Sequence, residues 1–231
     1  KRKCMKDIND VLFIVEARLH SSRMHQKMIK PFADTTLLDL LLSKLKSIDL
    51  IPKDNLYLSA YEDEIKDIGN KHNINIFSRS TESANAEDLQ TVKEWHDKLP
   101  FKYVVAINPC TPLIKAETIE GFIKSFIKSE DEGAFSVFEK QTYYWDKSGK
   151  MITKWPDGQQ MFNTKFVDPV YEAAHVLYAS RLDIIKKGYY ITDTLPVEPH
   201  LFVINELEAF DIDYDHQFKV AEQLYKIEKD V

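Results

Sequence analysis

A regular alternation of short apolar runs with longer amphipathic stretches constrains the fold of this chain more than any other feature. The first run, Val11-Leu12-Phe13-Ile14-Val15, is uninterrupted, as is Tyr103 to Ile107. Continuous apolar runs of strand length are typical of parallel strands that are buried on both faces. Strands that alternate with helices over the first half of the chain predict an α/β fold, with helices covering both faces of a mostly parallel sheet. The expected strands in this half are 11–15, 55–59, 74–77 and 103–107, and the expected helices start near residues 36, 62, 86 and 117.

The second half of the chain changes character. Residues 134–138 and an aromatic-rich stretch at 143–155 have the pattern of strands and a hairpin around Lys147-Ser148-Gly149-Lys150. Further strands are expected at 176–178 and 201–204, before a closing helix at residues 216–229. No internal repeat and no linker separates these parts, so we expect a single domain over residues 1–231 with an inserted arm at about residues 140–170.

Composition excludes several classes of protein. The chain has 231 residues, of which 44% are hydrophobic, which is enough for a core without disulfides or metal staples. No apolar run approaches membrane-spanning length, and residues 1–7 lack the apolar run of a signal peptide. We therefore expect a cytoplasmic protein without membrane insertion. The two cysteines, Cys4 and Cys110, favour neither a disulfide nor a zinc site.

The charge distribution points to a small anionic ligand. The net charge of −6 argues against nucleic acid as a partner, because nucleic-acid binding needs a basic surface. Residues 17–33 run against this trend, since they contain no acidic side chain. They contain four cationic side chains, namely Arg18, Arg23, Lys27 and Lys30.

This basic segment leaves the first strand at its carboxyl end, where ligands of α/β sheets generally bind. Phosphate groups need cationic side chains and hydrogen-bond donors at close quarters, and Ser21 and Ser22 add hydroxyl groups to the cations. We expect Arg23 and Lys27 to lie on an exposed loop. A solvated basic loop without a ligand is the alternative.

Two further segments carry candidate groups. The turn from Asn108 to Leu113 follows the fourth strand, and its alternative interpretation is a proline-rich connection to the next helix. Asp211 and Asp213 alternate on an extended segment, so their carboxylates point the same way and need a cation between them. Mg²⁺ held by these carboxylates together with nucleotide phosphates would supply it. The alternative is an acidic loop before the last helix, for which Asp215 is the expected cap.

These segments together resemble the sugar-acid cytidylyltransferases, which activate sialic acids, their bacterial relatives and Kdo as CMP-sugars. The pattern Ala-Arg-x-x-Ser-x-Arg-x-x-x-Lys at residues 17–27 is similar to the signature of that family. The turn at Asn108 resembles its Gln-Pro-Thr-Ser-Pro-Leu turn rather than the Asp-Glu-Pro turn of the Kdo enzymes, which favours the sialic-acid-like branch. The chain departs from the family at Leu19 and His20, where the sialic-acid enzymes have glycines, and at Ser22, where they have a basic residue.

The resemblance implies a Rossmann-like, three-layer nucleotidyltransferase fold with a small inserted dimerisation arm, and hence a homodimer. It implies Mg²⁺ at Asp211 and Asp213, with Lys27 and Arg23 as the catalytic groups. Phe77-Ser78-Arg79-Ser80 resembles the Arg-Pro turn of the family near the cytosine. The implied nucleotide-binding residues are Arg18, Ser21, Ser22, Arg23, Lys27, Arg79 and Asn108, and the weaker sugar-binding candidates are Gln141, Tyr143, Glu172 and His175.

The reaction implied is the transfer of CMP from CTP to a hydroxyl of an acidic, nonulosonic sugar with release of pyrophosphate, for surface-glycan biosynthesis. Two alternatives stay open at this point. Asp211-Ile212-Asp213 also matches the Asp-x-Asp motif of metal-dependent glycosyltransferases that use nucleotide-sugars. The altered loop would also suit a protein that binds nucleotide-sugars without catalysis.

Overall fold

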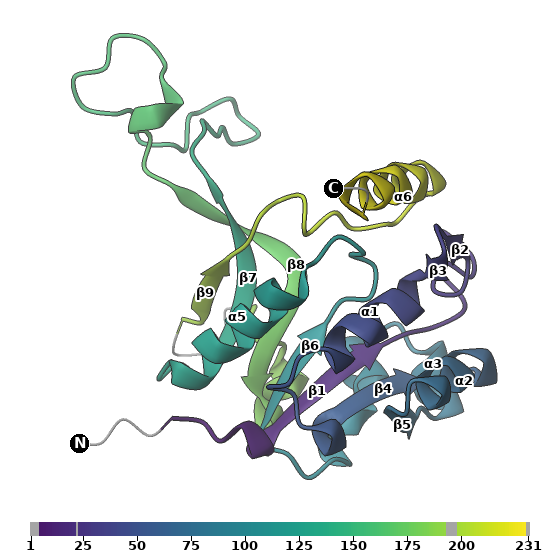
Figure 1. Cartoon of the computed structure of the whole chain (residues 1–231). Helices are drawn as coiled ribbons and strands as arrows, with labels where there is room; N and C mark the ends of the chain where they lie inside the picture. Colours follow the sequence, from purple (N-terminus) through teal and green to yellow (C-terminus); the bar gives the residue numbers. More distant parts are fainter. Residues whose placement is uncertain (1–4, 22, 193–197, 230–231) are drawn as a thin grey trace.

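The predicted alternation forms one seven-stranded sheet in the computed structural model, which describes residues 5–21, 23–192 and 198–229 (Figure 1). Ser22 and Cys4, which were considered above, lie outside the described residues. Along the sheet the strands follow the order β5-β4-β1-β6-β8-β7-β9, and only β8 runs antiparallel to its neighbours. The strands are β1 (Val11–Glu16), β4 (Leu56–Ala60), β5 (Asn75–Ser78), β6 (Tyr103–Ile107), β7 (Gly133–Lys140), β8 (Val170–Arg181) and β9 (His200–Val203). The predicted mostly parallel α/β sheet is confirmed.

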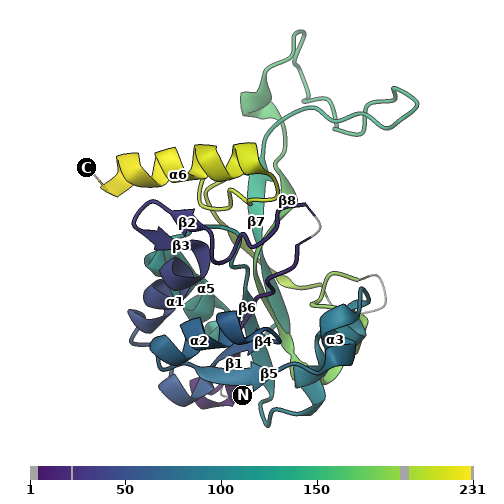
Figure 2. The same ribbon diagram turned by 90° about the vertical axis from the view of Figure 1, so that its right-hand side faces the viewer.

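Helices cover both faces of this sheet, and Figure 2 shows α1 and α5 on one side with α3 on the other. The helices are α1 (Leu37–Lys46), α2 (Asp63–Lys71), α3 (Thr81–Asn85), α4 (Leu89–Val92), α5 (Ala116–Lys128) and α6 (Asp215–Lys229), and a small separate sheet pairs β2 (Pro31–Phe32) with β3 (Thr35–Thr36). The single helix expected around residues 89–95 is wrong. Lys93 leaves the helical conformation, at φ −94° and ψ 37°, and a 3₁₀ turn at Glu94–Asp97 follows.

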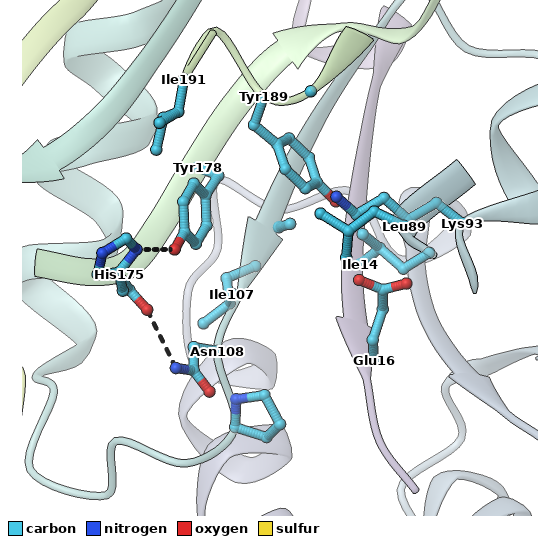
Figure 3. A pocket seen from close by; sticks show the side chains of 13 residues that line it. Ile14, Glu16, Leu89, Lys93, Ile107, Asn108, His175, Tyr178, Tyr189 and Ile191 are labelled. Carbon is cyan, nitrogen blue, oxygen red and sulfur yellow. Dashed lines mark hydrogen bonds between the residues drawn. The ribbon is translucent and has the colours of Figure 1, made fainter. Parts of the chain in front are cut away.

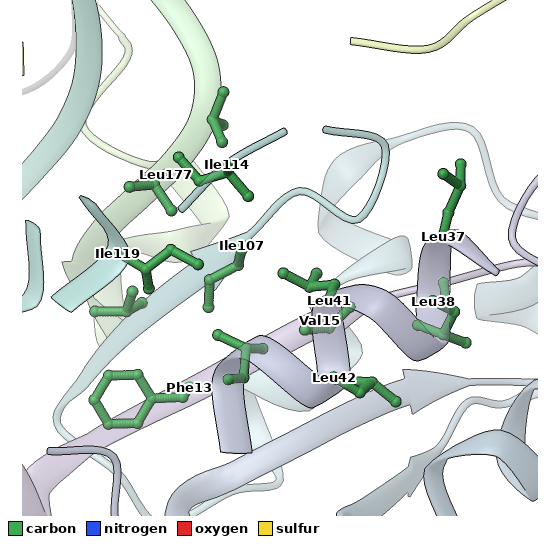
Figure 4. Close-up of a cluster of buried hydrophobic side chains, with 14 of the residues drawn as sticks. Phe13, Val15, Leu37, Leu38, Leu41, Leu42, Ile107, Ile114, Ile119 and Leu177 are labelled. Atoms are coloured by element: carbon green, nitrogen blue, oxygen red, sulfur yellow. The ribbon is translucent and has the colours of Figure 1, made fainter. Parts of the chain in front are cut away.

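The core divides along β1, whose alternate side chains face opposite sides of the sheet. Phe13 and Val15 pack with α1 and α5 in the larger cluster, part of which Figure 4 shows. Leu12 and Ile14 pack on the other face, in a second cluster that includes Trp95. Both faces of β1 are fully buried, which is the reason its sequence is apolar without interruption.

The predicted helix cap is confirmed for α1, the first helix, and is wrong for α6, the last one. The Thr36 side chain caps α1 by accepting a hydrogen bond from the Asp39 N–H. The prediction that Asp215 caps the last helix is wrong. Helix α6 begins at that residue, and the Asp215 carboxylate accepts one hydrogen bond from Lys30 and pairs with Lys219. Instead, the side-chain carbonyl of Gln217 accepts hydrogen bonds from the two N–H groups that precede the helix.

The segment between β7 and β8 projects away from the sheet as an arm (Figure 1). Within it the Tyr143 ring stacks on Trp155, with 5.6 Å between ring centroids, and Trp145 bridges to Met151. Much of its apolar surface faces solvent in the single chain. The exposed apolar side chains of the arm are Trp145, Ile152, Trp155, Met161, Phe162 and Phe166. In the part of the chain that the structure describes, no helix is long and apolar enough to span a membrane.

Candidate functional site

Three segments that are distant in sequence meet at the carboxyl ends of β1 and β6. They are the loop after β1, the turn after β6, and the extended residues before α6. Together they line a hollow of about 260 Å³, which we call the charged hollow. Seven of the predicted nucleotide and metal residues line it, namely Arg18, Ser21, Arg23, Lys27, Asn108, Asp211 and Asp213. The structure therefore brings the three sequence segments into one site.

The loop after β1 is anchored by its apolar side chains. Leu19, Met24 and Met28 are all buried in the larger core cluster. The Leu19 N–H donates a hydrogen bond of 3.0 Å to a carboxylate oxygen of Glu62, and the Leu19 carbonyl accepts one from the Gln26 N–H. Gln26 adopts the left-handed conformation, at φ 55°, which lets the chain reverse there. The leucine that departs from the family pattern thus fixes the path of the loop by packing inward.

Ion pairs inside the charged hollow join the basic loop to the acidic segment. Arg23 Nη1 lies 2.6 Å from Asp213 Oδ2, and Lys27 Nζ lies 3.6 Å from Asp213 Oδ1. Lys27 Nζ also donates a hydrogen bond of 2.6 Å to the Ile212 carbonyl. Lys27 is only 8% exposed, so the expectation that both cations lie on an exposed loop is wrong for this residue. Its apolar stem lies beside the core while its ammonium group reaches the hollow.

Asp211 is the unsatisfied member of the acidic pair. Its Oδ1 atom is buried and has no hydrogen-bond partner among the described residues. Burial raises the pKa of this carboxyl group, and the negative charge of Asp213 raises it further, while Lys27 and Arg23 act in the opposite direction. The Ile212 N–H donates to the Cys110 carbonyl, which ties the acidic segment to the turn after β6.

The two carboxylates do not by themselves complete a metal site. Among the described residues, no group of three or more His, Cys, Asp or Glu side chains is arranged to hold a metal ion. A buried carboxylate oxygen without a partner suits a hard cation such as Mg²⁺, which usually takes one or two carboxylates and completes its shell with phosphate oxygens and water. The donor set therefore fits Mg²⁺ only together with a phosphate ligand.

A second hollow of about 620 Å³ adjoins the charged one and shares Arg18 and Ser21 with it. Arg79, the predicted residue near the nucleobase, lies in its wall. The Arg79 side chain is held in place, because Nε donates to the Ser83 hydroxyl at 3.0 Å and Nη2 donates to the Ser83 carbonyl. Leu89 and Val92 contribute apolar surface. We call this the nucleoside hollow, after the part of a nucleotide that the sequence predicts near Arg79.

A third hollow of about 460 Å³, the apolar hollow, lies on the other side of Asn108 (Figure 3). The predicted sugar residue His175 reaches it from a bulge in β8, where its φ of 55° interrupts the register with β7. The His175 ring contacts the Tyr178 hydroxyl at 2.7 Å, and its carbonyl accepts a hydrogen bond from the Asn108 side chain. Burial raises the pKa of Tyr178 to about 12. Tyr189 and Ile191 supply apolar walls.

The structure places the other three sugar candidates in or at the base of the arm. The Gln141 side chain donates a hydrogen bond to the Val167 carbonyl, and the Tyr143 hydroxyl accepts one from the Asn163 N–H. Glu172 Oε2 lies 4.0 Å from Lys140 Nζ. None of the three lines the charged, nucleoside or apolar hollow. Their role in sugar binding stays a prediction.

Sequence reasoning missed a half-buried carboxylate at the centre of the site. Glu16 lines all three hollows, and its carboxylate accepts a 2.9 Å hydrogen bond from the Trp95 indole. Burial raises its pKa, which the indole hydrogen bond and the charges of Lys93 and Arg79 partly offset. Lys93 Nζ in turn lies 3.9 Å from the centroid of the Tyr189 ring. A charged residue directly after an apolar strand was the one available signal for Glu16, whereas nothing in the sequence marked Lys93 or Tyr189.

Comparison with known proteins identifies one family over most of the chain. The model of the cytidylyltransferase family matches residues 12–228. The chain is 24% identical over 120 residues to the spore coat polysaccharide biosynthesis protein SpsF of Bacillus subtilis (strain 168), a match that covers 51% of this chain and 50% of that protein. The chain thus spans about half the length of this curated relative.

Solved structures share the fold at low sequence identity. A CMP:2-keto-3-deoxy-manno-octonic acid synthetase complexed with CTP matches with a TM-score of 0.69 and 9% identity, over 94% of this chain and 99% of that one. A cytidylyltransferase from Leptospira borgpetersenii serovar Hardjo-bovis (strain JB197) gives 0.61 and 16%, over 94% and 87%. A 4-diphosphocytidyl-2C-methyl-D-erythritol synthase from Anaerococcus prevotii DSM 20548 gives 0.64 and 13%, over 95% and 98%. The predicted Rossmann-like nucleotidyltransferase fold is confirmed.

Proposed function

The chain belongs to the cytidylyltransferase family, whose members are CTP-dependent nucleotidyltransferases, and we propose that it transfers CMP from CTP to an acidic, sialic-acid-like sugar. The single observation that carries this proposal is the charged hollow. It joins Arg23 and Lys27 to Asp211 and Asp213 at the carboxyl end of the sheet, where α/β proteins bind nucleotides. The product would supply the synthesis of a surface glycan.

The cations of the charged hollow are suited to a triphosphate. Arg23 and Lys27 both contact Asp213, which keeps two like charges close together before a ligand arrives. Phosphate oxygens would accept charge-assisted hydrogen bonds from these side chains and from Arg18, with the Ser21 hydroxyl as a further donor. Because Arg18 and Ser21 also line the nucleoside hollow, the two hollows can hold the two halves of one nucleotide.

In the proposed reaction a sugar hydroxyl attacks the α-phosphorus of CTP. A bond forms between that oxygen and the α-phosphorus, the bond to the bridging oxygen of the β-phosphate breaks, and pyrophosphate leaves while the hydroxyl releases its proton. The protein contributes position and charge. Lys27 is held by the Ile212 carbonyl and Arg23 by Asp213, so both donors are oriented before negative charge develops on the phosphates.

We propose Mg²⁺ as the cofactor, held by Asp211 and Asp213 together with phosphate oxygens. The unpartnered Oδ1 of Asp211 supports this assignment. When bound, the ion neutralises charge on the phosphates and on the leaving pyrophosphate. Asp213 would then exchange part of its contact with Arg23 for the ion, which frees the guanidinium for phosphate.

The apolar hollow is the proposed sugar site. It adjoins the charged hollow at Asn108 and Pro109, so a sugar bound there lies next to the phosphates. His175 and Tyr178 supply polar groups for hydroxyls, while Tyr189 and Ile191 suit an acyl or deoxy portion of the sugar.

We also propose a homodimer that forms through the arm. Phe162 and Met161 are 78% and 76% exposed in the single chain, together with the indole of Trp145. Large apolar side chains gathered on one projecting segment mark an interaction surface.

A nucleotide screen by thermal unfolding tests the nucleotide half of this proposal and separates it from its two alternatives. At 100 times its dissociation constant, CTP should add about 2.7 kcal/mol to the free energy of unfolding. UTP, GTP and ATP at the same concentration should add less. Stabilisation by nucleotide-sugars but not by CTP would favour the glycosyltransferase. Stabilisation by CTP without formation of a CMP-sugar would favour the non-catalytic binding protein.

A further inference from the structure

Glu16 occupies the point where the three hollows meet. It is the last residue of β1, and its side chain projects to the same face of the sheet as Leu12 and Ile14. Figure 3 shows its carboxylate among the side chains of the apolar hollow, below Leu89. An ionisable group at the end of a fully buried strand is costly unless its position serves a ligand or a partner.

The carboxylate of Glu16 is fixed by one neighbour. Trp95 is fully buried, and its Nε1–H donates to Glu16 Oε1 at 2.9 Å. An indole N–H can only donate, so this oxygen is held as an acceptor toward Trp95. Among the described residues, no donor forms a hydrogen bond with the other oxygen, Oε2. Oε2 of Glu16 is therefore an acceptor in a fixed position that is available to a ligand.

The nucleoside hollow is lined both by this acceptor and by a fixed donor. Arg79 is immobilised by Ser83, and both Arg79 and Glu16 line the hollow. The apolar side chains of Leu89 and Val92 form a surface on which a flat ring can pack. A triphosphate in the charged hollow directs its nucleoside into this space, because Arg18 lines both.

We propose that the Glu16 carboxylate accepts a hydrogen bond from the exocyclic amino group of cytosine and thereby determines the preference for CTP over UTP. This inference rests on the function proposed above. Cytosine carries an amino group where uracil carries a carbonyl oxygen, and an ionised carboxylate is only an acceptor. Uracil would place two acceptors against each other, which disfavours UTP by repulsion and by loss of a hydrogen bond.

The substitution Glu16→Gln tests the assignment because it reverses the polarity of the group. Trp95 can only donate, so the amide carbonyl of the glutamine stays on the indole and the NH₂ group turns toward the base. The NH₂ group would donate to the carbonyl oxygen of uracil and oppose the amino group of cytosine. We expect the ratio of UTP to CTP affinity to rise at least about tenfold, with a gain in UTP affinity itself. Calorimetry with each nucleotide alone measures this, without a sugar.

Two variants keep the test decisive. Glu16→Ala removes the acceptor and supplies no donor, so it should weaken CTP binding without a gain for UTP. Glu82→Gln removes an exposed carboxylate of the nearby α3, which lines none of the three hollows, and should leave the ratio unchanged. If Glu16→Gln does not fold, Glu16→Ala decides, since its ratio of CTP to UTP affinity must fall toward one.

The failure of the inference can be told apart from the failure of the proposed function. Wild-type protein that binds CTP, with a Glu16→Gln variant whose CTP to UTP ratio stays within about twofold of wild type, overturns only the role of Glu16. Wild-type protein that binds neither nucleotide overturns the proposed function and this inference with it.

Discussion

The charged hollow and the apolar hollow share Asn108, Pro109 and Glu16, yet they are built in opposite ways. In the charged hollow the groups pair with one another, as Asp213 does with Arg23 and Lys27. The surface of the apolar hollow is mostly apolar although several polar side chains line it, and its walls come from segments around residues 89–93, 175–178 and 188–191. Under the proposed function, the first would bind the phosphates common to all nucleotides, while the shape of the second would select the sugar. Substitutions in the two hollows should therefore have different effects.

The largest effect is expected where the charged hollow loses a carboxylate. Asp211→Asn and Asp213→Asn should each lower pyrophosphate release by at least about 100-fold, because each removes charge that the phosphates and Mg²⁺ need. Turnover by the wild type should be lost in excess EDTA. Variants as active as the wild type, or wild-type turnover that persists in EDTA, would restore the interpretation of these residues as a simple acidic loop.

The same two variants should differ in stability. Asp211→Asn should raise the free energy of unfolding near neutral pH, since burial raises the pKa of this unpaired carboxyl group. A raised pKa means that the folded protein binds the proton more tightly, so the advantage of the variant should shrink as the pH falls through that pKa. Asp213→Asn should lower stability, because Arg23 and Lys27 lose their partner. Thermal unfolding from pH 7 to pH 4 without nucleotide measures both.

The next largest effects are expected from substitutions of the cationic side chains in the charged hollow. Arg23→Ala and Lys27→Ala should each weaken CTP binding by about 1.5–3 kcal/mol, the contribution of a charge-assisted hydrogen bond. Only Lys27→Ala should also destabilise the fold, because Lys27 is buried and satisfies the Ile212 carbonyl, whereas the Arg23 side chain is 54% exposed. Lys30→Ala is the matched control, since this exposed lysine pairs with Asp215 outside the hollow. Unchanged CTP affinity in both test variants would remove the phosphate assignment.

A smaller and more selective effect is expected in the apolar hollow. Tyr178→Phe removes the hydroxyl that contacts the His175 ring and should raise the KM for the sugar by about two- to tenfold, the range of a neutral hydrogen bond. The KM for CTP should stay the same, which is the reverse of the pattern for Arg23. Tyr171→Phe, on the same strand but hydrogen-bonded to Glu139 in the base of the arm, is the control. Equal changes in both KM values would contradict the separation of the two hollows.

Substitutions in the arm should change the oligomeric state more than the rate of the reaction. Replacing Met161 and Phe162 by Ser removes the most exposed apolar surface of the arm and should shift a dimer toward the monomer of 27.0 kDa. Light scattering at micromolar concentration measures the mass of both proteins. A wild-type monomer under these conditions would remove the dimer proposal.

The two hollows also differ in how far the sequence predicts them. The continuous run at 11–15 predicts a buried strand, and the basic segment that follows it must lie at the carboxyl end of the sheet. The charged hollow was therefore predictable from Arg23, Lys27 and the acidic pair. Periodicity shows which face of an element is buried, but not which residues of distant segments meet there. For that reason the sequence missed Tyr189.

The wrong predictions for Lys27 and Asp215 also arise because the sequence does not show which distant segments meet. The sequence shows Lys27 as a charged residue in a loop. It is buried because its ammonium group contacts Ile212 and Asp213, which lie far along the chain. Asp215 has the residue type of a helix cap, but Lys30, from a distant loop, pairs with its carboxylate. A neighbour that is distant in sequence decided each outcome, and a single sequence carries no signal of it.

One measurement tests the central claim most directly: pyrophosphate release by the wild-type protein from CTP, Mg²⁺ and a set of nonulosonic acids, with mass spectrometry of the products. The account predicts that pyrophosphate and a CMP-sugar appear in equal amounts, and that omitting CTP, the sugar or Mg²⁺ stops both. Pyrophosphate release without a sugar, or no CMP-sugar from any acidic sugar tested while CTP binds, would contradict it.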